Sequence, residues 1–156
     1  MRLNNLLSNC QTSKPTARSK GPLANMSSPD AAIRSTLNAY RDALVASDAS
    51  SIVPLYVEDG VTMAQHSPTQ IGHKAIEEWY TKCFELLTLD VEFTIEEVVV
   101  ASDEYAFART SSKGIQKFNA TGQMSKEANQ ELFVMQKVGG EWKIARYCFC
   151  TMNPPK

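Results

Sequence analysis

The sequence predicts an α+β fold in which three helices come first and a mostly antiparallel sheet follows. Two changes in the pattern of apolar residues support this order. Apolar residues recur every three or four positions over residues 30–47 and again over residues 72–87, which is the period of an amphipathic helix. From Leu89 onward apolar residues alternate with polar ones, which is typical of strands with one buried face.

The start of each helix carries its own signal. Ser-Pro-Asp at 28–30 combines an N-cap serine, a proline at the first helical position and an acid in the first turn. This helix is expected to end near Ser47, and Asp48 to cap a shorter helix over residues 49–56 that Pro54 shortens or bends. Gly72 opens the third helix.

Turn residues delimit the strands. Glu-Asp-Gly at 58–60 predicts a turn before a short strand over 61–65, and residues 67–70 read as a loop. Gly139-Gly140 is a strong signal for a two-residue hairpin. Residues 114–125 are interpreted as a connection, so the four later strands are expected to begin at Leu89 and to cover 105–113, 126–138 and 141–152.

Length and charge limit the classes of function. A chain of 156 residues fits one domain with its own core, expected over residues 30–156. That part carries 12 basic and 17 acidic side chains, without a Lys/Arg cluster. This argues against nucleic-acid binding, which depends on neutralising phosphates. No apolar run approaches the roughly 18 residues of a membrane span.

Residues 1–29 differ from the rest because they contain four basic residues and no acidic one. Their polar composition, broken by Pro15, Gly21 and Pro22, predicts a disordered tail. The alternative is an organellar transit peptide, since such segments are basic and contain few acids. The expected location is therefore cytoplasmic, or organellar if the tail is a transit peptide.

Three stretches resemble the NTF2-like superfamily, most closely its SnoaL-like and ketosteroid-isomerase-like branches: ALVASDASSIVPLYVEDGVTM (43–63), IGHKAIEEWY (71–80) and GGEWKIARY (139–147). The resemblance covers roughly residues 30–152. It implies a cone of three helices packed on a curved sheet that encloses a cavity, and usually a homodimer. The scaffold hosts isomerases, cyclases, dehydratases and non-catalytic association domains, so the resemblance implies a fold more than an activity.

The resemblance also suggests residues for a site. Tyr40 stands where ketosteroid isomerases place an oxyanion-hole tyrosine; the alternative is a core tyrosine. Glu131 falls where they place a carboxylic acid kept protonated by apolar surroundings, although it could equally be a solvated strand residue. The aspartate that abstracts a proton in the isomerases aligns with Ala64. Steroid isomerisation by that mechanism is therefore not expected.

His66 is the candidate general base, because imidazole titrates near neutrality and His66 would share a strand face with Ala64 if the strand persists. The alternative is a loop histidine. Arg109 is expected to pair with Glu131 or to hold an acidic substrate group, unless its face points outward. Tyr147 is a second positioning group. The expected substrate-binding set is completed by three aromatic residues: Phe133, Phe149 and Trp79.

The sequence has no metal-ligand spacing and no nucleotide-binding fingerprint, so neither metal nor cofactor is expected. The hypothesis from the sequence is a cofactor-independent acid–base enzyme of the isomerase, cyclase or dehydratase type, acting on a small apolar carbonyl compound. The alternative is a non-catalytic ligand-binding or association domain that dimerises through the outer face of its sheet.

Overall fold

The structure is a computed structural model and describes residues 28–153. The tail predicted for residues 1–29 lies outside this range except for its last two residues. Three helices precede the long strands, as the sequence predicts: α1 (Pro29–Val45), α2 (Ala49–Ile52) and α3 (Gly72–Leu86). A 3₁₀ turn, η1 (Val53–Leu55), follows α2.

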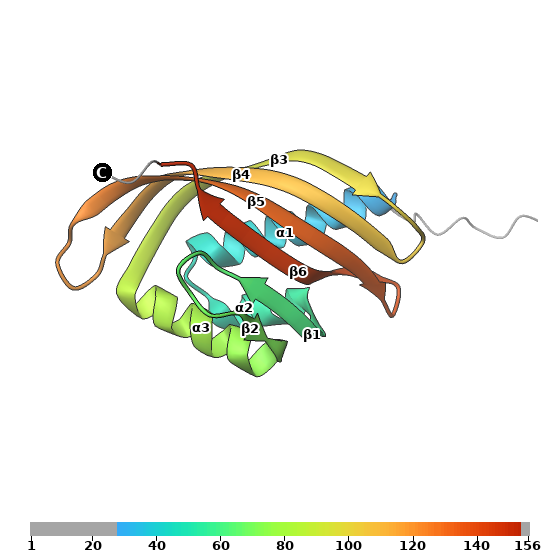
Figure 1. Ribbon diagram of the computed structural model, residues 1–156, viewed down its shortest axis with the longest axis horizontal. Coiled ribbons are helices and arrows are strands. Elements are labelled where there is room, and N and C mark those ends of the chain that lie inside the picture. Colours follow the sequence, from blue (N-terminus) through green and yellow to red (C-terminus); the bar gives the residue numbers. More distant parts are fainter. Residues whose placement is uncertain (1–27, 154–156) are drawn as a thin grey trace, which may run out of the picture.

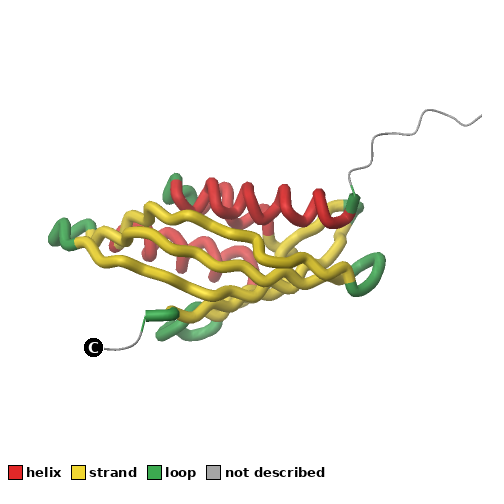
Figure 2. Tube along the Cα trace, turned by 90° about the horizontal axis from the view of Figure 1, so that it is seen from above, coloured by secondary structure: helices red, strands yellow, loops and turns green. Residues whose placement is uncertain are grey.

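Six strands form one sheet in the order β2-β1-β6-β5-β4-β3. Their bounds are β1 (Tyr56–Met63), β2 (Gln70–Ile71), β3 (Leu87–Val100), β4 (Tyr105–Phe118), β5 (Met124–Val138) and β6 (Glu141–Thr151). All neighbouring strands are antiparallel except β1 and β6, which are parallel. The sheet is curved, and the helices lie on its concave side (Figures 1 and 2). The α+β fold with three helices on a curved, mostly antiparallel sheet is confirmed.

The first two helices begin where the sequence predicts. Ser28 Oγ accepts a hydrogen bond from the Ala31 N–H at 3.2 Å, and Asp48 Oδ1 accepts one from the Ser51 N–H at 3.1 Å. The second helix is shorter than predicted, because α2 ends at Ile52 and the chain passes into the 3₁₀ turn that contains Pro54. Proline has no N–H to continue an α-helical ladder.

The turn predicted at 58–60 is wrong, because these residues lie inside β1. The pairing of β1 with β6 shifts register between Tyr56 and Val61, so the Glu-Asp-Gly sequence forms a bulge. A Cβ at Gly60 would lie 2.9 Å from Cδ1 of Tyr56. Turn-forming residues here mark an irregular strand and not its boundary. The loop predicted over residues 67–70 ends one residue earlier than expected, because Gln70 is the first residue of β2.

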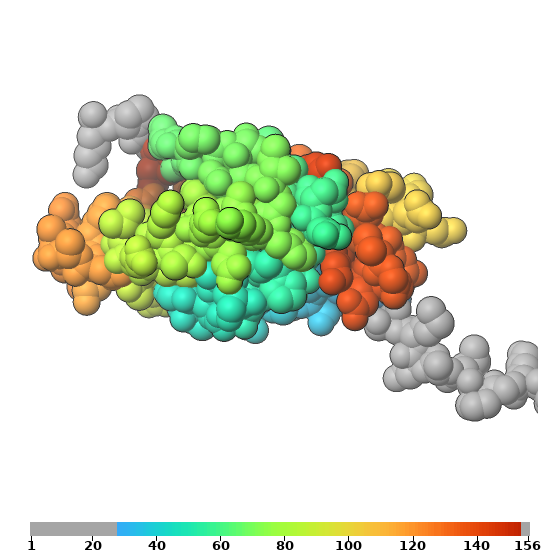
Figure 3. Space-filling model, turned by 90° about the horizontal axis from the view of Figure 1, so that it is seen from below, coloured from blue at the N-terminus to red at the C-terminus, as the bar shows by residue number. Residues whose placement is uncertain are grey.

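The connection predicted over residues 114–125 is mostly strand, since β4 continues to Phe118 and β5 begins at Met124. The signal that misled the prediction was Gly114. A Cβ there would overlap the carbonyl oxygen of Asp90 and lie 2.7 Å from Cα of Val91. The glycine therefore permits a close approach of β3 and β4. The long hairpin formed by β4 and β5 extends beyond α3 (orange in Figure 3).

Asn119, in the turn of that hairpin, holds the end of α3. Its Nδ2 donates to the carbonyl oxygens of Phe84 at 3.0 Å and Glu85 at 3.1 Å, and its backbone N–H donates to Leu86 at 2.9 Å. These are carbonyls that a helix end leaves without partners. The side chain thus substitutes for a C-capping residue and joins α3 to the β4–β5 hairpin.

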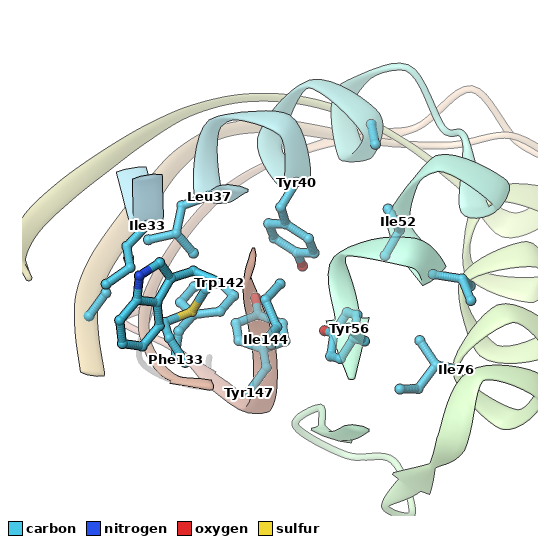
Figure 4. Packing of buried hydrophobic residues seen from close by; sticks show 14 of the residues in the cluster. Ile33, Leu37, Tyr40, Ile52, Tyr56, Ile76, Phe133, Trp142, Ile144 and Tyr147 are labelled. Atoms are coloured by element: carbon cyan, nitrogen blue, oxygen red, sulfur yellow. The ribbon is translucent and has the colours of Figure 1, made fainter. Parts of the chain in front are cut away.

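The core lies between the helices and the inner face of the sheet (Figure 4). The Tyr40 ring packs edge-on against Tyr80, Phe93, Phe133 and Tyr147, with centroid distances of 5.5 to 6.3 Å. Tyr40, a residue of α1, therefore contacts α3 and three long strands, β3, β5 and β6. Within residues 28–153, no helix is long and apolar enough to cross a membrane.

We expect Gly114→Ala to lower the free energy of unfolding by about 2 kcal/mol, since overpacking against backbone atoms cannot be relieved by a rotamer change. Gly122→Ala is the matched control. Gly122 has φ +70 but open space around its Cβ position, so only the backbone strain of about 1 kcal/mol applies. Urea denaturation of both variants measures the difference. A Gly114 variant as stable as the wild type would contradict the close approach of β3 and β4.

Candidate active site

A pocket of about 250 Å³ lies between the helices and the inner face of the sheet. Its wall has two chemically distinct parts. Helices α1 and α3 and strands β3 and β6 contribute mainly aromatic and aliphatic side chains. Strands β4 and β5 and the loop after β1 contribute polar ones: Gln65, His66, Ser112, Gln116, Glu127, Asn129 and Glu131. Neither Lys nor Arg lines this pocket.

A chain of buried hydroxyl groups leads to the aromatic part of the wall. Thr62 Oγ1 donates to the Tyr56 hydroxyl at 3.0 Å, Tyr56 and Tyr80 hydroxyls are 3.4 Å apart, and Tyr80 and Tyr40 hydroxyls 2.8 Å. Because each hydroxyl has one proton, a chain that starts with Thr62 as donor runs toward Tyr40. The Tyr40 hydroxyl stands at the pocket end of this chain, where it also interacts with the Tyr147 hydroxyl.

The tyrosines of this chain are donors at neutral pH. Burial raises the pKa of Tyr56 to about 12, and it raises the pKa values of Tyr40 and Tyr80 well above the usual range. The pKa of Tyr147, on the adjoining wall, is also raised well above the usual range, first by burial and then by the nearby charge of Glu131. These groups therefore stabilise a negative oxygen only by donating hydrogen bonds.

Glu131 is buried, with 7% of its surface exposed, and lies on the inner face of β5. Thr110 Oγ1 donates to its Oε2, and Ser112 Oγ donates to its Oε1 at 2.8 Å. Asn129 Nδ2 approaches Ser112 Oγ at 3.5 Å. Burial raises the pKa of Glu131, while the two hydroxyl donors oppose the rise. The environment thus favours the protonated carboxylic acid more than water does.

Thr110 and Ser112 were not among the residues predicted from the sequence. They alternate with Arg109 and Ser111 on β4. Because Arg109 faces outward, Thr110 and Ser112 face inward. Strand pairing places Thr110 directly opposite Glu131. Only the register between β4 and β5, which the sequence does not specify, could have identified them.

Most of the predicted site residues meet in this one pocket. His66, Tyr40 and Glu131, which were expected to be catalytic, all line it, as do Tyr147, Phe149 and Trp79. Phe133 does not. Its side chain is fully buried and stacks on Tyr147 with a centroid distance of 4.2 Å, so it supports the pocket wall from behind. Figure 4 shows Phe133 beside Tyr147 in the core.

His66 reaches the pocket by a route that the sequence did not predict. Strand β1 ends at Met63, so His66 does not share a strand face with Ala64. It lies in the following loop with φ 58 and is exposed at the rim. The neighbouring Ser67 accepts a hydrogen bond from Nε1 of Trp79 at 3.0 Å, which links this loop to α3. Ala64 itself is buried.

The prediction that Arg109 reaches the site is wrong. Its side chain lies on the outer face of the sheet, where Nε donates to Oε1 of Glu97 at 3.0 Å. The residue next to it, Thr110, points the opposite way and meets Glu131. Arg109 therefore neither pairs with Glu131 nor reaches the pocket. Among residues 28–153, no group of three His, Cys, Asp or Glu side chains is arranged to hold a metal ion.

Comparison with known proteins places this geometry in context. The profile of the SnoaL-like domain matches residues 37–146. A ketosteroid isomerase-like protein from Erwinia carotovora atroseptica is 33% identical, with a TM-score of 0.79, over 83% of this chain and 100% of that one. No curated protein matched the sequence.

Two more distant structures share the fold alone. A candidate scytalone dehydratase from Novosphingobium aromaticivorans is 17% identical, with a TM-score of 0.70, over 79% of this chain and 83% of that one. A hexachlorocyclohexane dehydrochlorinase is 11% identical, with a TM-score of 0.71, over 79% of this chain and 84% of that one.

The raised pKa of Glu131 predicts a pH-dependent stability. Between the ordinary carboxyl value of 4.5 and the folded-state pKa, the folded protein binds more protons than the unfolded chain. The free energy of unfolding therefore falls as pH rises through this window, by about 1.4 kcal/mol for each unit of difference. We expect Glu131→Gln to remove this fall in urea denaturation measured from pH 4.5 upward. Glu85→Gln, an exposed control on α3, should retain it; a wild type without the fall contradicts the burial argument.

Proposed function

The chain belongs to the SnoaL-like family, and on that premise we propose that it is a cofactor-independent acid–base enzyme for a small carbonyl compound. The reaction would be an isomerisation, a cyclisation or a dehydration through an enolate. One observation carries the proposal. The Tyr40 hydroxyl and the Glu131 carboxyl group, whose pKa values are both raised by burial, line the same pocket as the imidazole of His66.

The donors suit a developing enolate oxygen. The Tyr40 hydroxyl lies at the end of a hydrogen-bonded chain, so charge gained by its acceptor is spread over Tyr80 and Tyr56. Protonated Glu131 would donate from the opposite wall. Burial favours the uncharged, donating form of both groups, and their donation strengthens as the substrate oxygen becomes negative. The enolate then needs no further charge to stabilise it.

The proposed reaction begins with the substrate carbonyl oxygen at Tyr40 and Glu131. His66 takes a proton from the α-carbon, the C–H electron pair forms the enolate C=C bond, and the carbonyl π electrons move to oxygen. In an isomerisation, the same proton returns from His66 to the γ-carbon. In a dehydration, the enolate electrons expel a β-hydroxyl group, which leaves as water with that proton. Both routes balance without an oxidant or reductant.

The relatives are consistent with this class of chemistry. The 33% identical structure is described as ketosteroid isomerase-like, and a fold neighbour is a dehydrochlorinase. Because position 64 is alanine, we assign proton abstraction in this chain to His66, in the loop that follows β1. This reassignment is the point that most needs a test.

We expect the protein to exchange α-protons of cyclic β,γ-unsaturated ketones with deuterium from solvent, as followed by NMR. His66→Gln should slow exchange by at least about 100-fold, because it removes the base. Tyr40→Phe should slow it by about 100-fold, because it removes one donor to the enolate. Arg109→Gln, outside the pocket, should exchange at the wild-type rate. Exchange that survives His66→Gln would exclude His66 as the base.

A second role is proposed for the outer face of the sheet. Val99 and Phe107 are paired neighbours on β3 and β4, and Leu132 lies diagonally across from Phe107 on β5, opposite Arg109. Their exposed fractions are 38%, 38% and 44%. Adjacent exposed apolar residues on a sheet face indicate a protein contact surface. We infer that this surface joins two copies of the chain, with or without catalysis in the pocket.

Phe107→Glu is expected to convert a dimer into a monomer in sedimentation velocity, because it places two carboxylates in an apolar contact. Lys82→Glu, which introduces the same residue at an exposed position on α3, should leave the dimer intact. A wild-type protein that sediments as a monomer at all accessible concentrations would contradict the association.

A further inference from the structure

We propose that the pocket selects a ligand with a cationic end, and that Glu127 is the residue that recognises it. The inference deepens the proposed function, because it takes the carbonyl end of the ligand to lie at Tyr40 and Glu131. It concerns the opposite end of the pocket, toward the β4–β5 hairpin. The chemical class is a small carbonyl compound that carries a protonated amine.

The charges of the pocket exclude an acidic ligand. Its wall contains the carboxylate of Glu127, the carboxyl group of Glu131 that the proposed function takes as protonated, and no Lys or Arg. Arg109, the cation expected from the sequence, lies on the other face of the sheet in a bond with Glu97. An anionic group at the Glu127 end of the pocket would lose water without meeting a Lys or Arg side chain, and it would approach the Glu127 carboxylate.

Glu127 is placed to face the ligand. Glu127, Asn129 and Glu131 alternate along β5, so they share its inner face, and all three line the pocket. The residue paired with Glu127 on β4 is Gly114, which has no side chain to cover the carboxylate. Ser125 Oγ donates to Glu127 Oε1 at 3.1 Å and so orients it. None of the ion pairs within residues 28–153 involves Glu127.

The spacing of the two carboxylates defines the length of the ligand. Four residues along a strand separate Glu127 from Glu131, which is about 13 Å between their Cα atoms. Allowing for the side chains, a carbonyl oxygen at one end and an amine at the other would be roughly 10 Å apart. On β3, Val91 lies level with Glu127 and Leu89 lies beyond it, so both are apolar neighbours of the amine end. Between the two ends, Asn129 and Ser112 line the sheet side of the pocket, and aromatic and aliphatic side chains line its helix side. The middle of the ligand therefore has an apolar face toward the helices, as a ring with a short alkyl chain would have.

A matched series of ligands tests this inference. The probes are acetophenones whose para position carries a three-carbon chain ending in an amine, a carboxamide or a carboxylate. We expect calorimetry on the wild-type protein to give the tightest binding for the amine and the weakest for the carboxylate. The Trp79 indole N–H signal in NMR should shift with each bound ligand, because Trp79 lines the pocket.

Variants assign the preference to one residue. Glu127→Gln should weaken amine binding about fivefold, the order expected for a partly exposed ion pair, and leave amide binding unchanged. Glu127→Lys should reverse the order of amine and carboxylate. Glu92→Gln, the same charge change on β3 beside an exposed Lys113, is the control and should alter none of the three affinities.

Several outcomes would overturn the inference: equal affinities of the three probes, a preference for the carboxylate, a preference for the amine that persists in Glu127→Gln, or no binding of any probe. The proposed catalysis is judged separately by α-proton exchange with simple cyclic ketones. A protein that exchanges α-protons but shows no preference for the amine loses only the role of Glu127. One that prefers the amine but exchanges no protons loses only the acid–base chemistry.

Discussion

Burial of the Tyr40 hydroxyl is the constraint on which the rest of this molecule depends. A buried hydroxyl without a partner is costly, so Tyr40 must be satisfied from within the protein. Its partner, Tyr80, is on α3 and is equally buried, and Tyr80 in turn approaches Tyr56 of β1. The chain ends at Thr62, so one requirement positions both long helices and β1 relative to each other. No buried side-chain polar atom within residues 28–153 lacks a partner.

The same constraint produces a pocket with two kinds of wall. While the Tyr40 hydroxyl bonds to Tyr80, the Tyr40 ring packs against the aromatic rings around it. These rings make the helix side of the pocket apolar. On the sheet side, Glu131 is accepted in a buried position only because Thr110 and Ser112 donate to it. Stability and the proposed chemistry therefore share the same buried, hydrogen-bonded groups.

Sequence reasoning located the site where strand and helix periods were regular. Tyr40 and Glu131 could be assigned because the family resemblance suggests a tyrosine and a carboxylic acid at these positions, and both lie on elements with a regular period. His66 and Arg109 were harder. The route of His66 depends on where β1 ends, and the face of Arg109 depends on which parity of β4 points inward. Alternation shows which residues of β4 share a face. It does not show which of the two faces is buried, because Phe107 on one face and Ala108 on the other are both apolar.

What the sequence determined by itself is the order of elements, the helix caps at Ser28 and Asp48, and the family's fold, because these follow from local spacing and short-range hydrogen bonds. What only the tertiary structure decided are contacts between residues far apart in the chain. Gly114 and Gly60 resembled turn residues, yet both lie inside strands where another segment approaches closely. Strand register then set which hydroxyls meet Glu131 and left Glu127 uncovered, since register is a property of paired strands and not of either strand alone.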